Sequence, residues 1–198
     1  GGTGVRLERV ELFLLRLPLK RPYQTSGSVE THQTRVIARV ESEGAVGWGE
    51  SAAPELPWYS GETPRTVWYA LEEIILPQLL ATVLAGPEDV ERELRWIREH
   101  RMAKATVENA VWDLFAKRAA VPLARLLGGT RERILCGVAI GIQESIGALL
   151  DTIARELAAG YQRVKVKIKP GWDAEVAAAI RDRFPDLDFM LDANSAYT

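Results

Sequence analysis

The chain is poor in cysteine and histidine, the two residue types that most often mark zinc and redox sites. Its 198 residues include one cysteine, Cys136, and two histidines, His32 and His100. A single cysteine excludes an internal disulfide framework and a cysteine-rich zinc site. Two histidines this far apart exclude an HExxH helix and a histidine triad. Cys136 lies in an apolar segment, and we expect it to be buried in the core.

The chain also lacks an excess of either charge and a long apolar run. Lysine and arginine total 25 against 27 acidic residues, so the net charge is −2. The longest apolar stretch, residues 74–86, contains Pro77 and Gln78 and is too short to span a bilayer. No secretory signal is visible in the sequence, and we expect residues 1–4 to be the remnant of a cloning tag. We therefore expect a cytoplasmic protein with neither nucleic-acid nor membrane partners.

The first half of the chain predicts strands followed by helices. Strands are expected where apolar residues alternate or cluster, over residues 6–17, 35–41 and 45–50. The last two are joined by a hairpin turn at Glu43-Gly44. Helices are expected where apolar residues recur at helical spacing, over residues 65–76, 77–84, 88–100 and 103–119. The polar segment 20–33 is predicted to be a mobile loop, and 52–64 a second irregular stretch.

After Gly129 strands and helices alternate. Strands are expected over residues 134–142, 163–168 and 187–191, with helices over 145–159 and 173–183. Such an order with short connections predicts parallel strands and right-handed crossovers. Parallel strands need cover on both faces, so a three-stranded sheet is expected to be part of a larger one that this chain leaves unfinished.

Three lysines alternate with apolar residues along the second of these strands. In residues 164–169, Lys165, Lys167 and Lys169 share one face, because successive side chains on a strand point to opposite sides. The lysines of an edge strand would simply be solvated and would oppose aggregation. At the carboxyl-terminal rim of a barrel they would instead face an active site. There, a partly desolvated lysine beside another cation loses basicity and can accept a proton.

Asp192 ends the next strand, one strand-helix period after Lys167. Both side chains should therefore lie at the same rim of the sheet. Asp192 can be read as a turn former or helix N-cap. It can also be read as a ligand of Mg²⁺, which takes oxygen ligands and needs more than one of them. A metal ion and a lysine base together can remove a proton next to a carboxylate.

Several longer motifs resemble one known family. They are residues 47–51 (GWGES), 57–62 (PWYSGE), 108–113 (ENAVWD), 126–129 (LLGG), 165–173 (KVKIKPGWD) and 192–194 (DAN). Across residues 5–198 the sequence resembles the enolase superfamily, in its muconate-lactonizing subgroup. It is most similar to the o-succinylbenzoate synthase / N-acylamino acid racemase family. The resemblance implies an α+β capping domain over residues 5–129. The first three strands of a (β/α)₇β TIM-like barrel follow over residues 130–198, so that the barrel is incomplete in this chain.

The resemblance also implies roles for individual residues. Lys167 matches the family's catalytic base, and Lys165 its companion, which lowers the pKa of the base and contacts the substrate carboxylate. Asp192 matches the first Mg²⁺ ligand. The family's two further acidic ligands and its second lysine lie on later strands, which this chain lacks. We therefore expect the chain alone to hold Mg²⁺ poorly and to be inactive.

Four more residues are expected to bind substrate. Thr25 and Ser26 lie on one specificity loop of the capping domain and Tyr59 on another, while Asn194 lines the site beside Asp192.

Three functions stay open at this point. The first is a Mg²⁺-dependent lyase that dehydrates a hydroxy-cyclohexadiene carboxylate to o-succinylbenzoate, a menaquinone precursor. The second is a racemase of N-acyl or N-succinyl amino acids with the same base and metal. The third is a catalytically inactive fragment of such an enzyme. In every case the expected ligand is a small carboxylate, and the full-length protein is expected to form a homo-oligomer.

Overall fold

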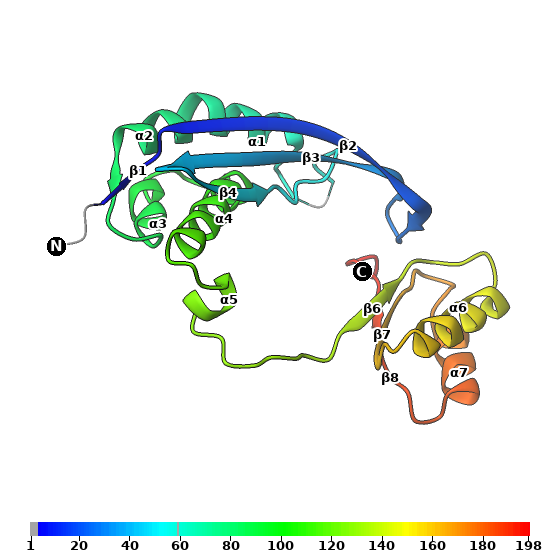
Figure 1. Cartoon of the computed structure of the whole chain (residues 1–198). Helices are drawn as coiled ribbons and strands as arrows, with labels where there is room; N and C mark the ends of the chain where they lie inside the picture. The colour runs from blue at the N-terminus through cyan, green and yellow to red at the C-terminus, as the bar shows by residue number, and fades with distance from the viewer. Residues whose placement is uncertain (1–3, 59) are drawn as a thin grey trace. The chain divides into compact units, whose positions relative to one another are not determined.

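The structure, a computed structural model, describes residues 4–58 and 60–198, which fall into two compact units (Figure 1). The first unit contains the described residues up to Leu17 together with Gln33–Thr130. The second contains Pro18–His32 together with Arg131–Thr198. Residues 18–32, assigned by the sequence to the first domain, thus group by their contacts with the second unit. None of the helices in the described ranges is long and apolar enough to cross a membrane.

The predicted strands of the first half form antiparallel pairs. A three-stranded sheet has the order β2-β3-β4, formed by β2 (Arg9–Gln24), β3 (Val29–Ser42) and β4 (Ala45–Glu50). The turn between β3 and β4 is at Glu43-Gly44 as predicted, and both residues have positive φ. Two short strands, β1 (Val5–Arg6) and β5 (Val83–Leu84), pair separately.

The prediction of a mobile loop over residues 20–33 is wrong. β2 continues through Pro22 to Gln24, and β3 already begins at Val29, so only residues 25–28 form a turn. Proline is tolerated in β2 because this strand lies at the edge of its sheet, where a missing N–H breaks no ladder. The polar composition of the segment reflects a two-stranded hairpin with exposed faces.

The helices of this unit are α1 (Pro64–Tyr69), the π-helix η1 (Ala70–Ile75), α2 (Leu76–Ala81), α3 (Asp89–Leu94), α4 (Arg101–Arg118) and α5 (Leu123–Leu126). Their bounds differ from the predicted ones in three places. The helix expected over residues 77–84 ends at Ala81, because residues 83–84 form strand β5. Pro77 does not separate two helices, since α1, η1 and α2 follow one another without a break and Pro77 comes just after the π-helical turns of η1. The helix expected up to His100 stops at Leu94. Before α4 begins, Glu99 and His100 adopt positive φ, which no helix accommodates.

Strand β4 lies directly against helix α4. The inward-facing positions of the strand are Gly47 and Gly49, whereas Trp48 and Glu50 point outward. A Cβ at Gly49 would lie 1.9 Å from the carbonyl oxygen of Thr106, and one at Gly47 would lie 2.0 Å from that of Ala110. Both distances are far inside van der Waals contact, so this approach of strand and helix is open only to glycine.

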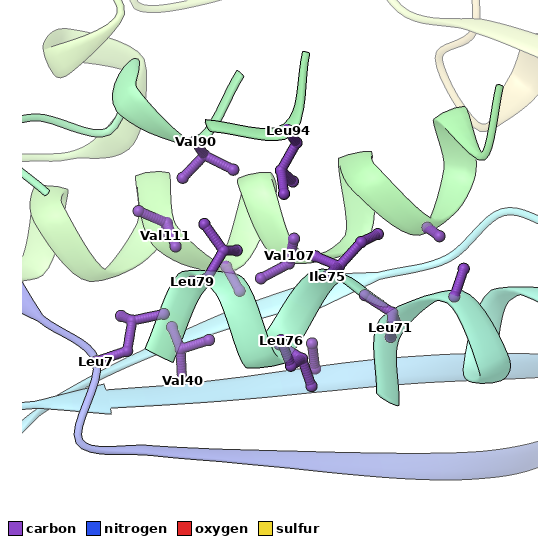
Figure 2. Packing of buried hydrophobic residues seen from close by; sticks show 14 of the residues in the cluster. Leu7, Val40, Leu71, Ile75, Leu76, Leu79, Val90, Leu94, Val107 and Val111 are labelled. Atoms are coloured by element: carbon purple, nitrogen blue, oxygen red, sulfur yellow. The ribbon is translucent and has the colours of Figure 1, made fainter. Parts of the chain in front are cut away.

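The core of the first unit fills the space between the sheet and the helices. Figure 2 shows Ile75 and Leu79 beside Val107 and Val111 of α4, and these residues are completely buried. The same cluster includes residues from β1, β3 and α3, among them Val40 and the labelled Leu94. Burial of each such side chain contributes roughly 1.5–3 kcal/mol before entropy is counted, so this unit has a substantial core of its own.

The second unit contains the predicted parallel strands. Its elements are β6 (Gly137–Ile140), α6 (Ile146–Ala158), β7 (Arg163–Lys167), α7 (Ala174–Arg183) and β8 (Asp188–Asp192). The strands pair in parallel in the order β6-β7-β8, which confirms the expected direction. Ser145 caps α6 by accepting from the amide of Ala148 at 3.1 Å. Val164 and Val166 are buried with residues of α6 and α7 such as Ile153.

The prediction that Cys136 is buried is wrong. The first parallel strand begins only at Gly137, and Cys136 is exposed. Ile134 and Leu135 just before it are about 70% exposed as well. A continuous apolar run indicates a buried strand only where a partner strand lies beside it, and residues 131–136 lie outside the sheet.

Candidate active site

The lysine-bearing strand β7 is the central strand of the parallel sheet. Because β6 and β8 pair with it on either side, the alternative of a solvated edge strand is wrong. Its valines face the helices, so Lys165 and Lys167 point to the opposite face of the sheet. In the register of the sheet Lys167 is paired with Asp192, the last residue of β8. The two strand ends therefore bring the predicted base and the predicted carboxylate together.

The ammonium group of Lys167 lies between two oxygen acceptors. Its Nζ donates to Asp192 Oδ2 at 2.8 Å and to Asn194 Oδ1 at 2.7 Å. The side chain of Lys167 is only 8% exposed, whereas that of Lys165 is 41% exposed. Lys165 Nζ approaches the same oxygen, Asp192 Oδ2, at 3.2 Å. Lys167 is thus held in a fixed position, while Lys165 reaches solvent.

Asp192 is held ionised by these neighbours. The hydrogen bond from Lys167 is the main cause that lowers the pKa of Asp192 to about 2, against partial burial, which raises it. The amide of Asn194, at 3.0 Å from Oδ1, and the side chain of Lys165 lower it further. The carboxylate therefore keeps its negative charge throughout the range in which enzymes work.

This arrangement predicts a specific loss of stability in acid. Because the pKa of Asp192 falls from 3.8 to about 2 on folding, its ionisation stabilises the fold above pH 4, and that contribution disappears as the pH falls towards 2. We expect about 1–2 kcal/mol, reduced by solvent because the side chain is 24% exposed. Hydrogen exchange of the β7 amides at pH 5 and pH 2.5 measures it. Asp192→Asn should show a smaller acid effect, and an equal effect in both proteins would contradict the assignment.

The residues of this chain do not by themselves fit a Mg²⁺ ion. Within residues 4–58 and 60–198 there is no group of three or more histidine, cysteine, aspartate or glutamate side chains that could hold a metal. The two oxygens of Asp192 already accept from two lysines and a backbone amide. Since Mg²⁺ needs several oxygen ligands in octahedral geometry, a metal site here would require ligands beyond those that the chain places around Asp192.

The tip of the β2-β3 hairpin, residues 25–28, contains two more predicted site residues, Thr25 and Ser26. Ser26 Oγ donates to the carbonyl oxygen of Ala193 at 2.7 Å, between the two acceptors of Lys167. The hydroxyl of Thr25 is used inside the tip, where it accepts from the amides of Gly27 and Ser28. Thr25 is buried. The structure therefore places Ser26 at the site and Thr25 behind it. Tyr59 lies outside the described residues.

Tyr23 is a site residue that the sequence did not single out. Burial raises the pKa of the Tyr23 hydroxyl, the nearby charge of Lys165 lowers it, and Asp192 and Glu30 raise it again. The charges of Lys165 and Asp192 therefore act on the Tyr23 phenol. Tyr23 lies on β2, two residues before Thr25. A prediction that this strand extends to residue 24 would have indicated Tyr23 as a neighbour of the site.

Comparison with known proteins identifies the relatives of this chain. Residues 9–128 match the family described as mandelate racemase / muconate lactonizing enzyme, N-terminal domain. The chain is 48% identical over 195 residues to an o-succinylbenzoate synthase of Geobacillus kaustophilus, covering 98% of this chain and 52% of that protein. It is 44% identical to an N-succinylamino acid racemase of Thermus thermophilus, covering 98% and 53%.

A solved structure extends the likeness to the fold. An enolase superfamily member from Listeria innocua matches with a TM-score of 0.92 and 38% identity, covering 98% of this chain and 53% of that one. The chain thus spans about half the length of the curated relatives that it matches. Both units are shared with those relatives, since the matches run over nearly all of its residues. The chain therefore belongs to the mandelate racemase / muconate lactonizing enzyme family, in the muconate-lactonizing subgroup of the enolase superfamily.

Proposed function

We propose that the enzyme containing this chain is an o-succinylbenzoate synthase in which Lys167 is the general base. The single observation that carries the proposal is the placement of Lys167 Nζ, 2.8 Å from Asp192 and 2.7 Å from Asn194 at the rim of a parallel sheet. The 48% identical relative named o-succinylbenzoate synthase supports the choice of reaction. We also propose that residues 5–129 are the capping domain and residues 130–198 the beginning of the barrel.

The proposed reaction is a dehydration that begins next to a carboxylate. Neutral Lys167 takes the proton from the carbon α to the carboxylate of a hydroxy-cyclohexadiene substrate. The electron pair left behind then expels the hydroxyl group, which leaves as water with the proton that Lys167 carries. Asp192 and Asn194 accept from the ammonium form, so the charge created in the first step is stabilised where it arises. Lys165, which reaches solvent, would contact the substrate carboxylate.

A second candidate function uses the same base. The 44% identical relative is named N-succinylamino acid racemase, so an N-succinyl or N-acyl amino acid is the alternative substrate. Racemisation needs a second group that returns a proton to the opposite face of the α-carbon. Lys165 and Lys167 point to the same face of one strand, so Lys165 is not placed to act as that second group.

The metal requirement of the reaction is a separate part of the proposal. In this family Asp192 would be one ligand of a divalent ion, and the remaining ligands would lie outside this chain. We propose that turnover depends on Mg²⁺ and that the 198-residue chain alone neither binds it tightly nor turns over.

One experiment separates these functions. The enzyme containing this chain is assayed for o-succinylbenzoate formation and for racemisation of N-succinyl amino acids, with Mg²⁺ and with excess chelator. We expect dehydration that the chelator abolishes, and the 198-residue chain assayed beside it should be inactive. Racemisation without dehydration would favour the second candidate. If the whole enzyme catalysed neither reaction, both proposed functions would be wrong. Light scattering of the same sample tests the proposed homo-oligomer.

A further inference from the structure

The hairpin tip and the turn after β8 are joined by one side-chain hydrogen bond. Ser26 Oγ donates to the carbonyl oxygen of Ala193 at 2.7 Å, across 167 positions of sequence. Ala193 lies between Asp192 and Asn194, the two residues that accept from Lys167. The bond from Ser26 therefore acts on the short piece of backbone that carries both acceptors.

This turn has a conformation that needs support from outside. Asn194 and Ser195 have φ values of +49° and +60°, in the left-handed region that residues other than glycine adopt infrequently. The amide of Ala196 also donates to the carbonyl of Ala193, at 3.1 Å. On the other side the amide of Ile168 donates to the carbonyl of Asp192, at 2.9 Å. Ser26 reaches this turn from the hairpin, and its hydroxyl takes the second lone pair of the Ala193 carbonyl.

The hairpin tip is itself fixed in place. Thr25 closes it by donating its amide to the carbonyl of Ser28 and by accepting from two amides with its hydroxyl. The carbonyl of Gln24, next to it, accepts from the amide of Ile142 at 2.9 Å. A Cβ at Gly141 would lie 2.9 Å from the same carbonyl, so hairpin and sheet approach closely here. Ser26 is therefore presented to Ala193 by a rigid support within the second unit.

A hydroxyl group has one hydrogen to donate, and that of Ser26 is given to Ala193. Ser26 thus has no donor left for a substrate, although the sequence suggested substrate binding. We propose that Ser26 is a positioning residue. Through Ala193 it holds the 192–195 turn so that Asp192 and Asn194 keep Lys167 aimed at the substrate carbon. This proposal rests on the proposed role of Lys167, because positioning matters only if Lys167 reacts.

The test compares three variants of the enzyme containing this chain. Ser26→Ala removes the bond to Ala193, and Ser26→Thr keeps the hydroxyl. Ser28→Ala is the matched control, since it removes a hydroxyl from the same tip that does not reach the turn. We expect Ser26→Ala to lower kcat about tenfold or more, the scale of one lost hydrogen bond and a misplaced reacting group. KM should change less than about twofold, and Ser26→Thr should restore most of kcat.

A second readout does not depend on activity. The amide of Asn194 donates to Asp192 Oδ1 within the turn, so its hydrogen exchange reports whether the turn is held. We expect this exchange to be faster in Ser26→Ala than in the wild type and unchanged in Ser28→Ala. If the wild-type enzyme proves inactive, the proposed function fails and the exchange rates alone decide whether the turn is held.

Three results would overturn the positioning role. A rise in KM with kcat preserved would return Ser26 to substrate binding. A loss of kcat that Ser26→Thr does not restore would point to a general disturbance of the tip. Unchanged exchange of the Asn194 amide in Ser26→Ala would mean that the turn does not depend on this bond.

Discussion

Replacing Lys167 by alanine is expected to lower the turnover of the enzyme containing this chain by at least about a thousandfold, because no other group takes over proton removal. The fold should survive the change. Asp192, the main partner of Lys167, keeps Lys165 and the amide of Asn194 as donors. Steady-state assay with the o-succinylbenzoate precursor measures the first effect, and thermal unfolding measures the second.

Two further variants show whether the base or merely its charge is needed. Lys167→Arg keeps a cation between the acceptors but cannot give up its proton, so it should be as inactive as Lys167→Ala and more stable. Lys169→Ala is the matched control. It removes a lysine two residues further along the chain, and β7 already ends at Lys167. Turnover retained by Lys167→Arg would refute proton abstraction by this residue.

Replacing Gly49 by alanine is expected to destabilise the first unit by about 3 kcal/mol or more, above the usual cost of overpacking. The added Cβ would lie 1.9 Å from the Thr106 carbonyl and 2.9 Å from the Ala110 amide. Both neighbours are backbone atoms of α4, which cannot rotate away as a side chain could. Strand β4 would have to move off the helix, and the buried face behind it would open. Urea unfolding followed by far-UV circular dichroism measures the loss.

The control for this substitution is Gly61→Ala, in the same unit. A Cβ at Gly61 meets no atom within 4 Å, and its φ lies outside the left-handed range. We therefore expect Gly61→Ala to be neutral or slightly stabilising, since alanine has less freedom in the unfolded chain. If Gly49→Ala unfolded at the same urea concentration as Gly61→Ala, the close packing of β4 on α4 would be refuted.

The part of the site that lies on regular strands could be predicted from the sequence. Alternation along β7 placed Lys165 and Lys167 on one face, and one strand-helix period placed Asp192 beside them, as the structure has it. Both inferences use only the geometry of parallel strands. The roles assigned to these residues came from resemblance and stay proposals.

The contacts made by loops and backbone atoms could not be predicted in this way. The acceptor of Ser26 is a carbonyl oxygen, which every residue has, so no residue type marks Ala193. Polar composition predicts a loop where β2 continues, so the sequence does not indicate Tyr23. Apolar composition predicts that Cys136 is buried, but this residue is exposed because no strand lies beside it. In each case the deciding fact is a tertiary partner, which local composition does not contain.

The membership of residues 18–32 in the second unit has a consequence for recombination between relatives. A chimera joined at residue 130 would take the hairpin tip from one parent and the 137–142 and 192–195 segments from the other. The Ser26 hydroxyl and the turn that accepts from it would then come from different parents, as would Gln24 and the closely packed Gly141. Exchange of residues 18–32 together with everything after 130 leaves these contacts within one parent. A hybrid that keeps the second unit whole therefore needs three crossover points, whereas the boundary predicted from the sequence needs one.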